Sequence, residues 1–163
     1  MNIALAEAYY FGRDYDAAIE QAQRAIELAP DVALAHYNLG RAYEQKNLHE
    51  KALAEFQRAR ELAPNAATIV PLGYAYARMG QRERAHEALG QLEKLSHTQY
   101  VPAIYSAMIY TGMGDKDNAF QWLDKAVAEH CDYLIFLDHD PMADPLRGDP
   151  RFGALIKKIS THP

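Results

Sequence analysis

Cysteine is almost absent from this chain: Cys131 is the only one among 163 residues. A single cysteine excludes an intrachain disulfide and any metal site built from several thiolates of this chain. The first dozen residues contain Glu7 and have no basic stretch followed by an apolar core, so they do not resemble a secretory signal. These features favour a cytoplasmic location.

Long apolar runs and clusters of basic residues are absent as well. No run approaches the roughly 18 apolar residues of a membrane-spanning helix, although 49% of the residues are apolar. The 17 basic residues are scattered and outnumbered by 22 acidic ones, for a net charge of -5. Phosphate contacts require clustered Lys and Arg. We therefore expect neither a nucleic acid nor a membrane as partner, and a mild preference for neutral or basic partners.

What the chain does contain is a repeat of about 34 residues. The copy at residues 33–66 can be shifted back by 34 positions and forward by 33 and then 34, with apolar and small residues falling in the same places each time. The equivalent sets are Leu5, Ala6, Tyr9, Ala18, Ala22 and Ala25; Leu39, Gly40, Tyr43, Ala52, Phe56 and Ala59; Leu72, Gly73, Tyr76, Ala85, Leu89 and Leu92; and Ala107, Tyr110, Ala119, Leu123 and Ala126. Such periodicity is typical of arrays of stacked units.

Within each repeat, apolar residues at i, i+3, i+4 and i+7 predict two helices. The eight predicted helices cover about residues 3–11, 15–28, 33–45, 48–62, 67–79, 82–95, 102–113 and 116–129. Gly80, Gly114 and Asn47 lie between paired helices, where a left-handed residue stops the first helix. Arg13 occupies that place in the first repeat, and Gly12 is expected to take over the role. Pro30 and Pro64 should end the second helices.

Small residues are expected where paired helices approach each other closely. Gly40, Gly73 and Ala107 share one position on the first helices, and they should face Ala52, Ala85 and Ala119 on the second helices. After residue 129 the period stops. Asp149 and Pro150 then predict a last helix from about residue 150 to 159, with Phe152 on its apolar stripe.

The repeat W-x2-L-G-x2-Y, A-x3-F and P is the tetratricopeptide signature, which the chain resembles over about residues 1–129. The resemblance implies an all-α fold, a right-handed α-solenoid of four helix-turn-helix repeats with a C-terminal helical cap. It predicts a single domain over residues 1–163, with repeats at about 1–32, 33–65, 66–99 and 100–131 and a capping segment at 132–163. The string DPMADPLRGDPRF further resembles the tail of tetratricopeptide regions in larger bacterial regulatory and signalling proteins. Because Met1 falls at the third position of its repeat, neighbouring segments are expected upstream.

The resemblance also implies a function, which is to hold a protein or peptide partner in the concave groove. The groove would be formed by the helix faces opposite the apolar stripes, and aromatic, Arg and Met side chains of the kind that interfaces favour recur there. The predicted partner-binding residues are Tyr37, Asn38, Arg41, Gln45, Tyr74, Arg78, Tyr105 and Met108. The alternative is that these tyrosines only pack between neighbouring helices.

A second hypothesis is self-association. The first helix has no preceding repeat, so its apolar side chains would be covered by another copy in a homodimer. The residues predicted for this contact are Ile3, Leu5, Tyr9 and Tyr10.

An enzyme or a metal protein is not expected. No nucleophile–base set or glycine-rich phosphate loop is present, so no catalytic residue and no cofactor is predicted. His130, Cys131, Asp138, His139 and Asp140 lie close together in the chain, but their spacing matches no metal signature. We interpret the aspartates as turn residues, because several of them precede prolines.

Overall fold

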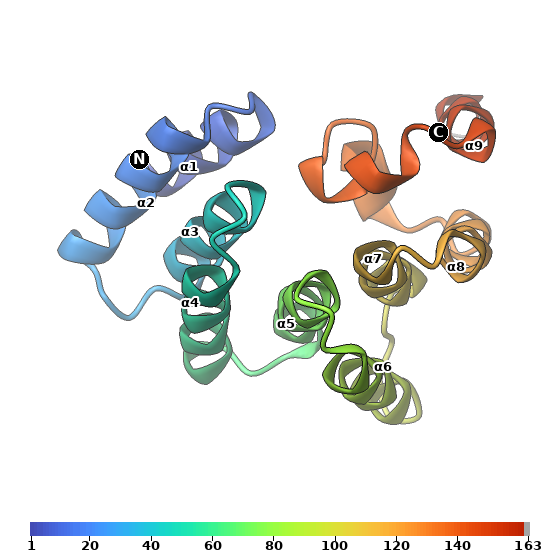
Figure 1. The fold of residues 1–163 in the computed structure, drawn as a ribbon, viewed down its shortest axis with the longest axis horizontal. Coiled ribbons are helices and arrows are strands. Elements are labelled where there is room, and N and C mark those ends of the chain that lie inside the picture. Colours follow the sequence, from blue (N-terminus) through green and yellow to red (C-terminus); the bar gives the residue numbers. More distant parts are fainter. Residues whose placement is uncertain (162–163) are drawn as a thin grey trace.

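The computed structural model describes residues 1–161 and confirms the predicted all-α solenoid. Eight helices form four antiparallel pairs, followed by two 3-10 segments and a last helix (Figure 1). The elements are α1 (Asn2–Phe11), α2 (Tyr15–Leu28), α3 (Ala33–Gln45), α4 (His49–Leu62), α5 (Ala66–Arg78), α6 (Arg82–Ser96), α7 (Ala103–Met113), α8 (Lys116–Ala128), η1 (Asp132–Phe136), η2 (Pro141–Leu146) and α9 (Pro150–Thr161). Residues 162–163, at the end of the predicted capping segment, lie outside the described residues.

The helix pairs follow an arc, with both described ends of the chain at its open side (Figure 1). The first helix of each pair packs on the first helix of the next, so α1, α3, α5 and α7 form the inner layer. The second helices α2, α4, α6 and α8 form the outer layer. The inner layer therefore supplies the concave face on which the predicted groove residues lie.

Each pair is joined by a turn that contains one left-handed residue. Gly80 and Gly114 have φ of 75° and 73°, and Asn47 has φ of 58°, as predicted. The prediction for the first repeat was wrong: Gly12 is right-handed, and Arg13 itself takes φ of 64°. The Asp14 amide donates to the Tyr9 carbonyl at 2.9 Å, as the equivalent amides do in the other turns. The hydrogen-bonding pattern thus fixes which position is left-handed, whatever residue occupies it.

The helix ends before proline also agree with the sequence. Ala29 and Ala63 precede Pro30 and Pro64, and they leave the helical region with φ of -151° and -142°. The ring of proline disfavours helical dihedral angles in the residue before it. The two second helices therefore end at equivalent positions.

Gly40 makes the expected close contact, but with a different neighbour. A Cβ added at Gly40 would lie 2.5 Å from Cε1 of Phe56, so the phenyl ring rather than Ala52 requires glycine there. Likewise, a Cβ at Gly73 would meet Ile109 at 2.6 Å and Ala88 at 2.9 Å, not Ala85. For Gly40 and Gly73 the close approach is confirmed, but the nearest side chains are Phe56, Ile109 and Ala88 rather than the predicted Ala52 and Ala85.

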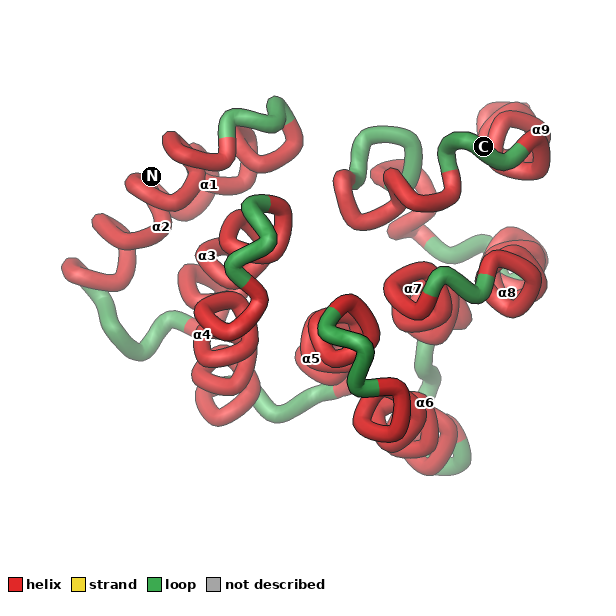
Figure 2. Tube along the Cα trace, in the orientation of Figure 1, coloured by secondary structure: helices red, strands yellow, loops and turns green. Residues whose placement is uncertain are grey.

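The chain after α8 does two things. Helix α9 lies against α8, with Phe152 and Leu155 buried, and so covers the last pair as a cap. Between α8 and α9, η1 and η2 turn into the arc, and η2 packs on α7 (Figure 2). Leu137 and Leu146 of this stretch are fully buried in one core with Leu92, Ile109 and Leu123. The stretch from η1 to η2 is thus part of the core of the second half of the molecule.

Candidate functional site

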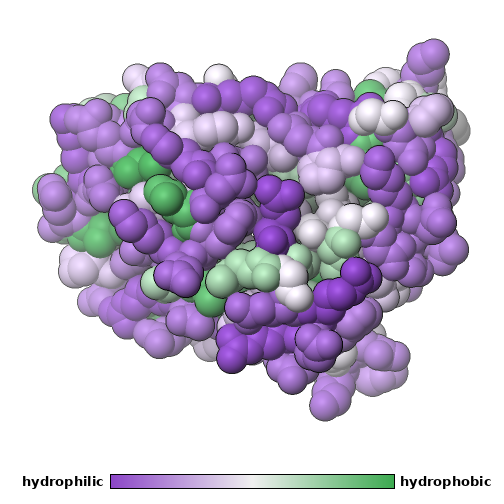
Figure 3. Space-filling model, viewed as in Figure 1, coloured by the Kyte–Doolittle hydropathy of each residue, from purple (hydrophilic) through white to green (hydrophobic). Residues whose placement is uncertain are grey.

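The concave face is already occupied, by residues 132–147 of the chain itself, which we call the C-terminal segment. In the ribbon view a gap separates α1 from this segment (Figure 1), but side chains fill that gap in the space-filling view of the same face (Figure 3). At its centre lies the carboxylate of Asp140, which is 1% exposed. It accepts hydrogen bonds from Tyr10 Oη at 3.1 Å, Tyr133 Oη at 2.7 Å and the Met142 amide at 2.9 Å.

The two phenols beside Asp140 are held in their protonated form. Burial, and after it the charge of Asp140, raises the pKa of Tyr10 well above its ordinary value. Burial is also the main reason why the pKa of Tyr133 is raised, with the neighbouring Tyr37 and Asp140 adding to it. A protonated phenol donates to a carboxylate oxygen, so this network links the first repeat to the C-terminal segment.

Arg41 lies next to this network and is 2% exposed. Its guanidinium stacks over the rings of Tyr10 and Tyr37, at 4.2 and 4.7 Å from the ring centroids. The Nη2 of Arg41 donates to Asn38 Oδ1 at 2.9 Å and lies 3.6 Å from a Glu7 carboxylate oxygen. Within residues 1–161, the Nε of Arg41 has no protein hydrogen-bond partner. Arg41 and Asn38 therefore join the core on the inner side of the arc.

A second set of contacts, nearer the surface, closes the arc. Arg13 donates to both carboxylate oxygens of Asp144, at 2.6 and 2.7 Å. The rings of Phe11 and Phe136 stack with centroids 6.0 Å apart. We call these two contacts the seam. They join the end of α1 to η1 and η2.

The structure divides the predicted groove residues into two groups. Asn38, Arg41, Tyr74 and Met108 are buried; for example, Tyr74 Oη donates to the Met142 carbonyl at 3.3 Å. Tyr37, Gln45 and Tyr105 are half-buried, and Arg78 is exposed, with Nη2 donating to Asn47 Oδ1 at 3.3 Å. The helix faces do point inward as expected. The C-terminal segment contacts Tyr74, whereas Asn38 and Arg41 are packed against α1.

The concave face contains a small opening. A cavity of about 90 Å³ lies beside the first two turns of α3, α5 and α7. Its lining consists of Tyr37, Ala67, Val70, Ile104, Tyr105, Met108, Tyr133, Asp140 and Met142. We call it the concave opening. It brings together three predicted residues, Tyr37, Tyr105 and Met108, with three that sequence reasoning missed, Tyr133, Asp140 and Met142. The Asp-Pro pairs of the C-terminal segment indicated turns, and nothing in the sequence indicated where those turns pack.

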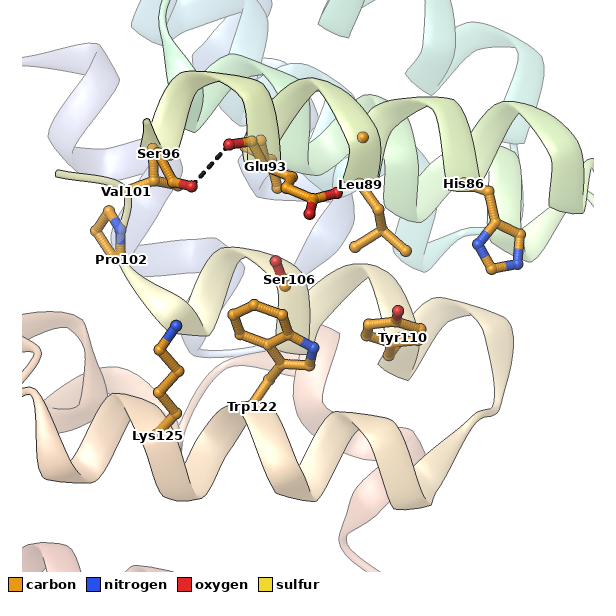
Figure 4. A pocket seen from close by; sticks show the side chains of 12 residues that line it. His86, Leu89, Glu93, Ser96, Val101, Pro102, Ser106, Tyr110, Trp122 and Lys125 are labelled. Atoms are coloured by element: carbon orange, nitrogen blue, oxygen red, sulfur yellow. Dashed lines mark hydrogen bonds between the residues drawn. The ribbon is translucent and has the colours of Figure 1, made fainter. Parts of the chain in front are cut away.

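The outer side of the array carries a larger depression, the outer groove, of about 370 Å³ between α6 and α8 above α7 (Figure 4). Leu89 and Glu93 reach into it from α6, Ser106 and Tyr110 form its floor on α7, and Trp122 and Lys125 come from α8 (Figure 4). The connection before α7 covers residues 97–102, whereas the corresponding connections cover only 29–32 and 63–65. Val101 and Pro102 of this longer connection line the outer groove.

The residues predicted for self-association do not share one face. Leu5 and Tyr9 are 40% and 39% exposed on α1, and Ile3 is half-buried. Tyr10 is fully buried and points inward to Asp140. Met1, Ala4 and Ala8 are also exposed, so the solvent-exposed side of α1 is apolar along its length.

Among residues 1–161, no three His, Cys, Asp or Glu side chains converge as a metal site would require. Asp138 binds Arg147, and Asp140 binds the two phenols described above. None of the helices in this range is both long and apolar enough to span a membrane.

Comparison with known proteins agrees with the repeat. Two tetratricopeptide-repeat family models match the chain, one over residues 3–67 and one over residues 106–128. The chain belongs to the tetratricopeptide-repeat family. A search of curated proteins finds no match.

Two solved structures are similar to this tetratricopeptide chain in fold. One is the type IV pilus biogenesis factor PilW, with 20% identity, a TM-score of 0.61, and coverage of 98% of this chain and 75% of that one. The other is MamA, with 18% identity, a TM-score of 0.53, and coverage of 96% and 91%. Tetratricopeptide arrays generally mediate protein–protein interactions and are typically non-catalytic.

Proposed function

We propose that this chain is a scaffold that binds a protein or peptide partner at the concave opening. The observation that carries the proposal is the composition of that opening. Tyr37, Tyr105 and Tyr133 surround a space that takes one side chain of a partner, and tyrosine is enriched in the residues that contribute most to binding. The C-terminal segment closes the rest of the concave face. A partner therefore binds at the concave opening without displacing the C-terminal segment.

This proposal changes the predicted binding set. Tyr37, Tyr105 and Met108 remain in it, and Tyr133 of the C-terminal segment joins them. Asn38, Arg41 and Tyr74 support the opening from behind, because their side chains are buried. Gln45 and Arg78 are the last residues of α3 and α5, whereas the opening lies beside the beginnings of these helices, so they are not part of the proposed binding set.

The test blocks the opening without disturbing the core. Ala67 lines the opening and is exposed at the start of α5, so Ala67→Met should fill the space at little cost in stability. The matched control is Ala54→Met, at an exposed site on α4. Peptides selected from a displayed random library would be measured by fluorescence anisotropy. We expect Ala67→Met to weaken binding about tenfold or more and Ala54→Met to leave it unchanged. Equal binding by both variants would contradict the proposal.

Self-association through α1 is a second candidate function, because the solvent-exposed side of α1 is apolar along its length. Within α1 the only charged side chain is Glu7, and it lies 3.6 Å from Arg41 on the inner side. Leu5→Glu and Tyr9→Glu would place charge on the exposed side. If α1 forms the contact, sedimentation at rising concentration should show a dimer for the wild type and a monomer for both variants. A wild-type monomer at every concentration would exclude this candidate.

A further inference from the structure

A wide aromatic groove lies next to the concave opening and shares Tyr105 and Tyr133 with it. This groove, of about 530 Å³, runs between the connection before α7 and the corner from α8 into η1. We call it the aromatic groove and define it by Tyr100, Tyr105, Glu129, Asp132, Tyr133, Ile135 and Phe136. Three of these, Tyr100, Ile135 and Phe136, are among the most exposed large apolar side chains of the described chain, at 65%, 68% and 44%.

The exposure of Ile135 follows from the local geometry of η1. In a 3-10 helix, side chains at i and i+3 lie above one another. Leu134 and Leu137 consequently point together into the core, and both are buried. Asp132 and Ile135 point together to solvent, so a carboxylate stands beside an exposed aliphatic side chain. An exposed apolar patch with a polar rim is characteristic of an interaction site.

The carboxylates Glu129 and Asp132 dominate the charge around the aromatic groove. His130 also lines it, while no Lys or Arg does. Glu129 Oε2 faces the groove and accepts weakly from Tyr100 Oη at 3.4 Å and from the Ala103 amide at 3.3 Å. Its other oxygen lies 3.8 Å from Lys125 Nζ, and Lys125 belongs to the outer groove. Asp132 remains solvent-exposed, and the whole chain carries a net charge of -5.

We propose that the aromatic groove binds a peptide segment of the partner in which Lys or Arg adjoins apolar side chains. The apolar side chains of the peptide pack on Ile135 and Tyr100. Its Lys or Arg lies between the tyrosine rings of the groove and the Asp132 carboxylate. Aromatic rings and carboxylates both attract cations, and Arg and Lys stems also cover apolar surface. The proposal rests on the proposed function, because the partner reaches this groove from the concave opening across Tyr105 and Tyr133.

The test uses a displayed library of random short peptides, selected on the full chain. The enriched peptides are synthesised, and their affinities are measured for the wild type and for variants. Ile135→Ser, Tyr100→Ser and Asp132→Asn change the aromatic groove at exposed positions, and Ala67→Met blocks the concave opening. Leu28→Ser is the matched control, because Leu28 is 80% exposed at the end of α2.

We expect the enriched peptides to carry Lys or Arg next to apolar residues. Ile135→Ser and Tyr100→Ser should each weaken binding about tenfold, and Leu28→Ser should have no effect. Replacing the peptide's lysine by norleucine, which keeps the apolar stem, should weaken binding, and so should Asp132→Asn or added salt. Bound peptide should also slow alkylation of Cys131, the sole cysteine, which lines this groove.

Several results would overturn the proposal. Peptides that lose affinity with Ala67→Met but not with Ile135→Ser or Tyr100→Ser would refute the aromatic groove and leave the proposed function intact. Enrichment of acidic peptides, or a norleucine peptide that binds as well as its parent, would refute the predicted chemistry. If no peptide is enriched, or none responds to any of these variants, both proposals fail.

Discussion

The two halves of the arc are held together in different ways. From α5 onward, one continuous core joins α5 to α9 and includes Leu137 and Leu146 of the C-terminal segment. In α1 to α4, buried residues form separate small clusters in which alanines predominate, such as Ala6, Ala22 and Leu39; one of these clusters extends to Leu72 and Ala75 of α5. Buried leucines contribute far more apolar area than alanines. The second half therefore provides most of the stability. The first half is attached to it through the packing of α4 on α5 and, across the arc, through Asp140 and the seam.

The largest effect is expected from Leu137→Ala, which breaks the stronger half. Leu137 is fully buried, and removing a buried leucine side chain costs roughly 2–5 kcal/mol of unfolding free energy. Chemical denaturation followed by circular dichroism would measure this loss. Leu34→Ala, at a 48% exposed site on α3, is the control and should cost less than about 0.5 kcal/mol. Similar losses for both variants would mean that the C-terminal segment is not part of the core.

Gly40→Leu tests the packing of the weaker half. The new side chain would collide with the Phe56 ring, and overpacking of this kind costs roughly 1–3 kcal/mol. The same substitution at Gly90, where an added Cβ meets no atom within 4 Å, should be neutral or stabilising by up to about 1 kcal/mol, because glycine is a poor helix former. Thermal denaturation of the two variants compares them directly. An unchanged melting temperature for Gly40→Leu would contradict the close contact.

Arg13 offers a smaller effect that separates two causes. Arg13→Ala removes the ion pair with Asp144 and keeps a side chain in a left-handed conformation, whereas Arg13→Gly removes the ion pair and the strain. The difference between the two variants should be about 1 kcal/mol in favour of glycine. Hydrogen exchange in α1 and α2 would report it, with faster exchange in Arg13→Ala. Equal exchange in both variants would show that the strain at this position is negligible.

The smallest effect is the pH dependence of the seam. Hydrogen bonds from Arg13, and then from Arg147, lower the pKa of the Asp144 carboxyl below its ordinary value, although burial opposes them. Because the folded pKa is lowered, the stabilisation is complete above the unfolded pKa of about 3.9 and is lost as pH falls through the folded value. Asp144 is about one-third exposed, so the contribution should stay below about 1 kcal/mol.

Melting temperatures of the wild type and Asp144→Asn would measure this contribution. The two proteins should differ near neutral pH and converge in strong acid. In an Arg13→Ala background the difference should shrink, because the main hydrogen-bond donor is gone. A difference that grows as the pH falls would have the wrong sign for this account.

The sequence predicts those features that depend on neighbours in the chain. Pro30 ends its helix, Gly80 occupies its turn, and Tyr37 and Tyr105 lie on the inner helix faces, because each follows from local geometry or from helical periodicity. The left-handed conformation of Arg13 was not predicted, because the hydrogen-bonding pattern of the turn overrides the preference of Gly12 for that conformation. Tyr10 and Asp140 are 130 residues apart, and the period ends before Asp140. No local pattern in one sequence indicates that such a pair meets, so the occupant of the concave face could not be predicted.

The central claim is that the C-terminal segment fills the concave face and reaches the first repeat. Nuclear Overhauser contacts in solution between the ring protons of Phe11 and Phe136 test it most directly, because these rings stack across the seam. We predict cross-peaks between the two rings. Their absence, in spectra where α1 and η1 each give the contacts expected within themselves, would contradict a closed arc.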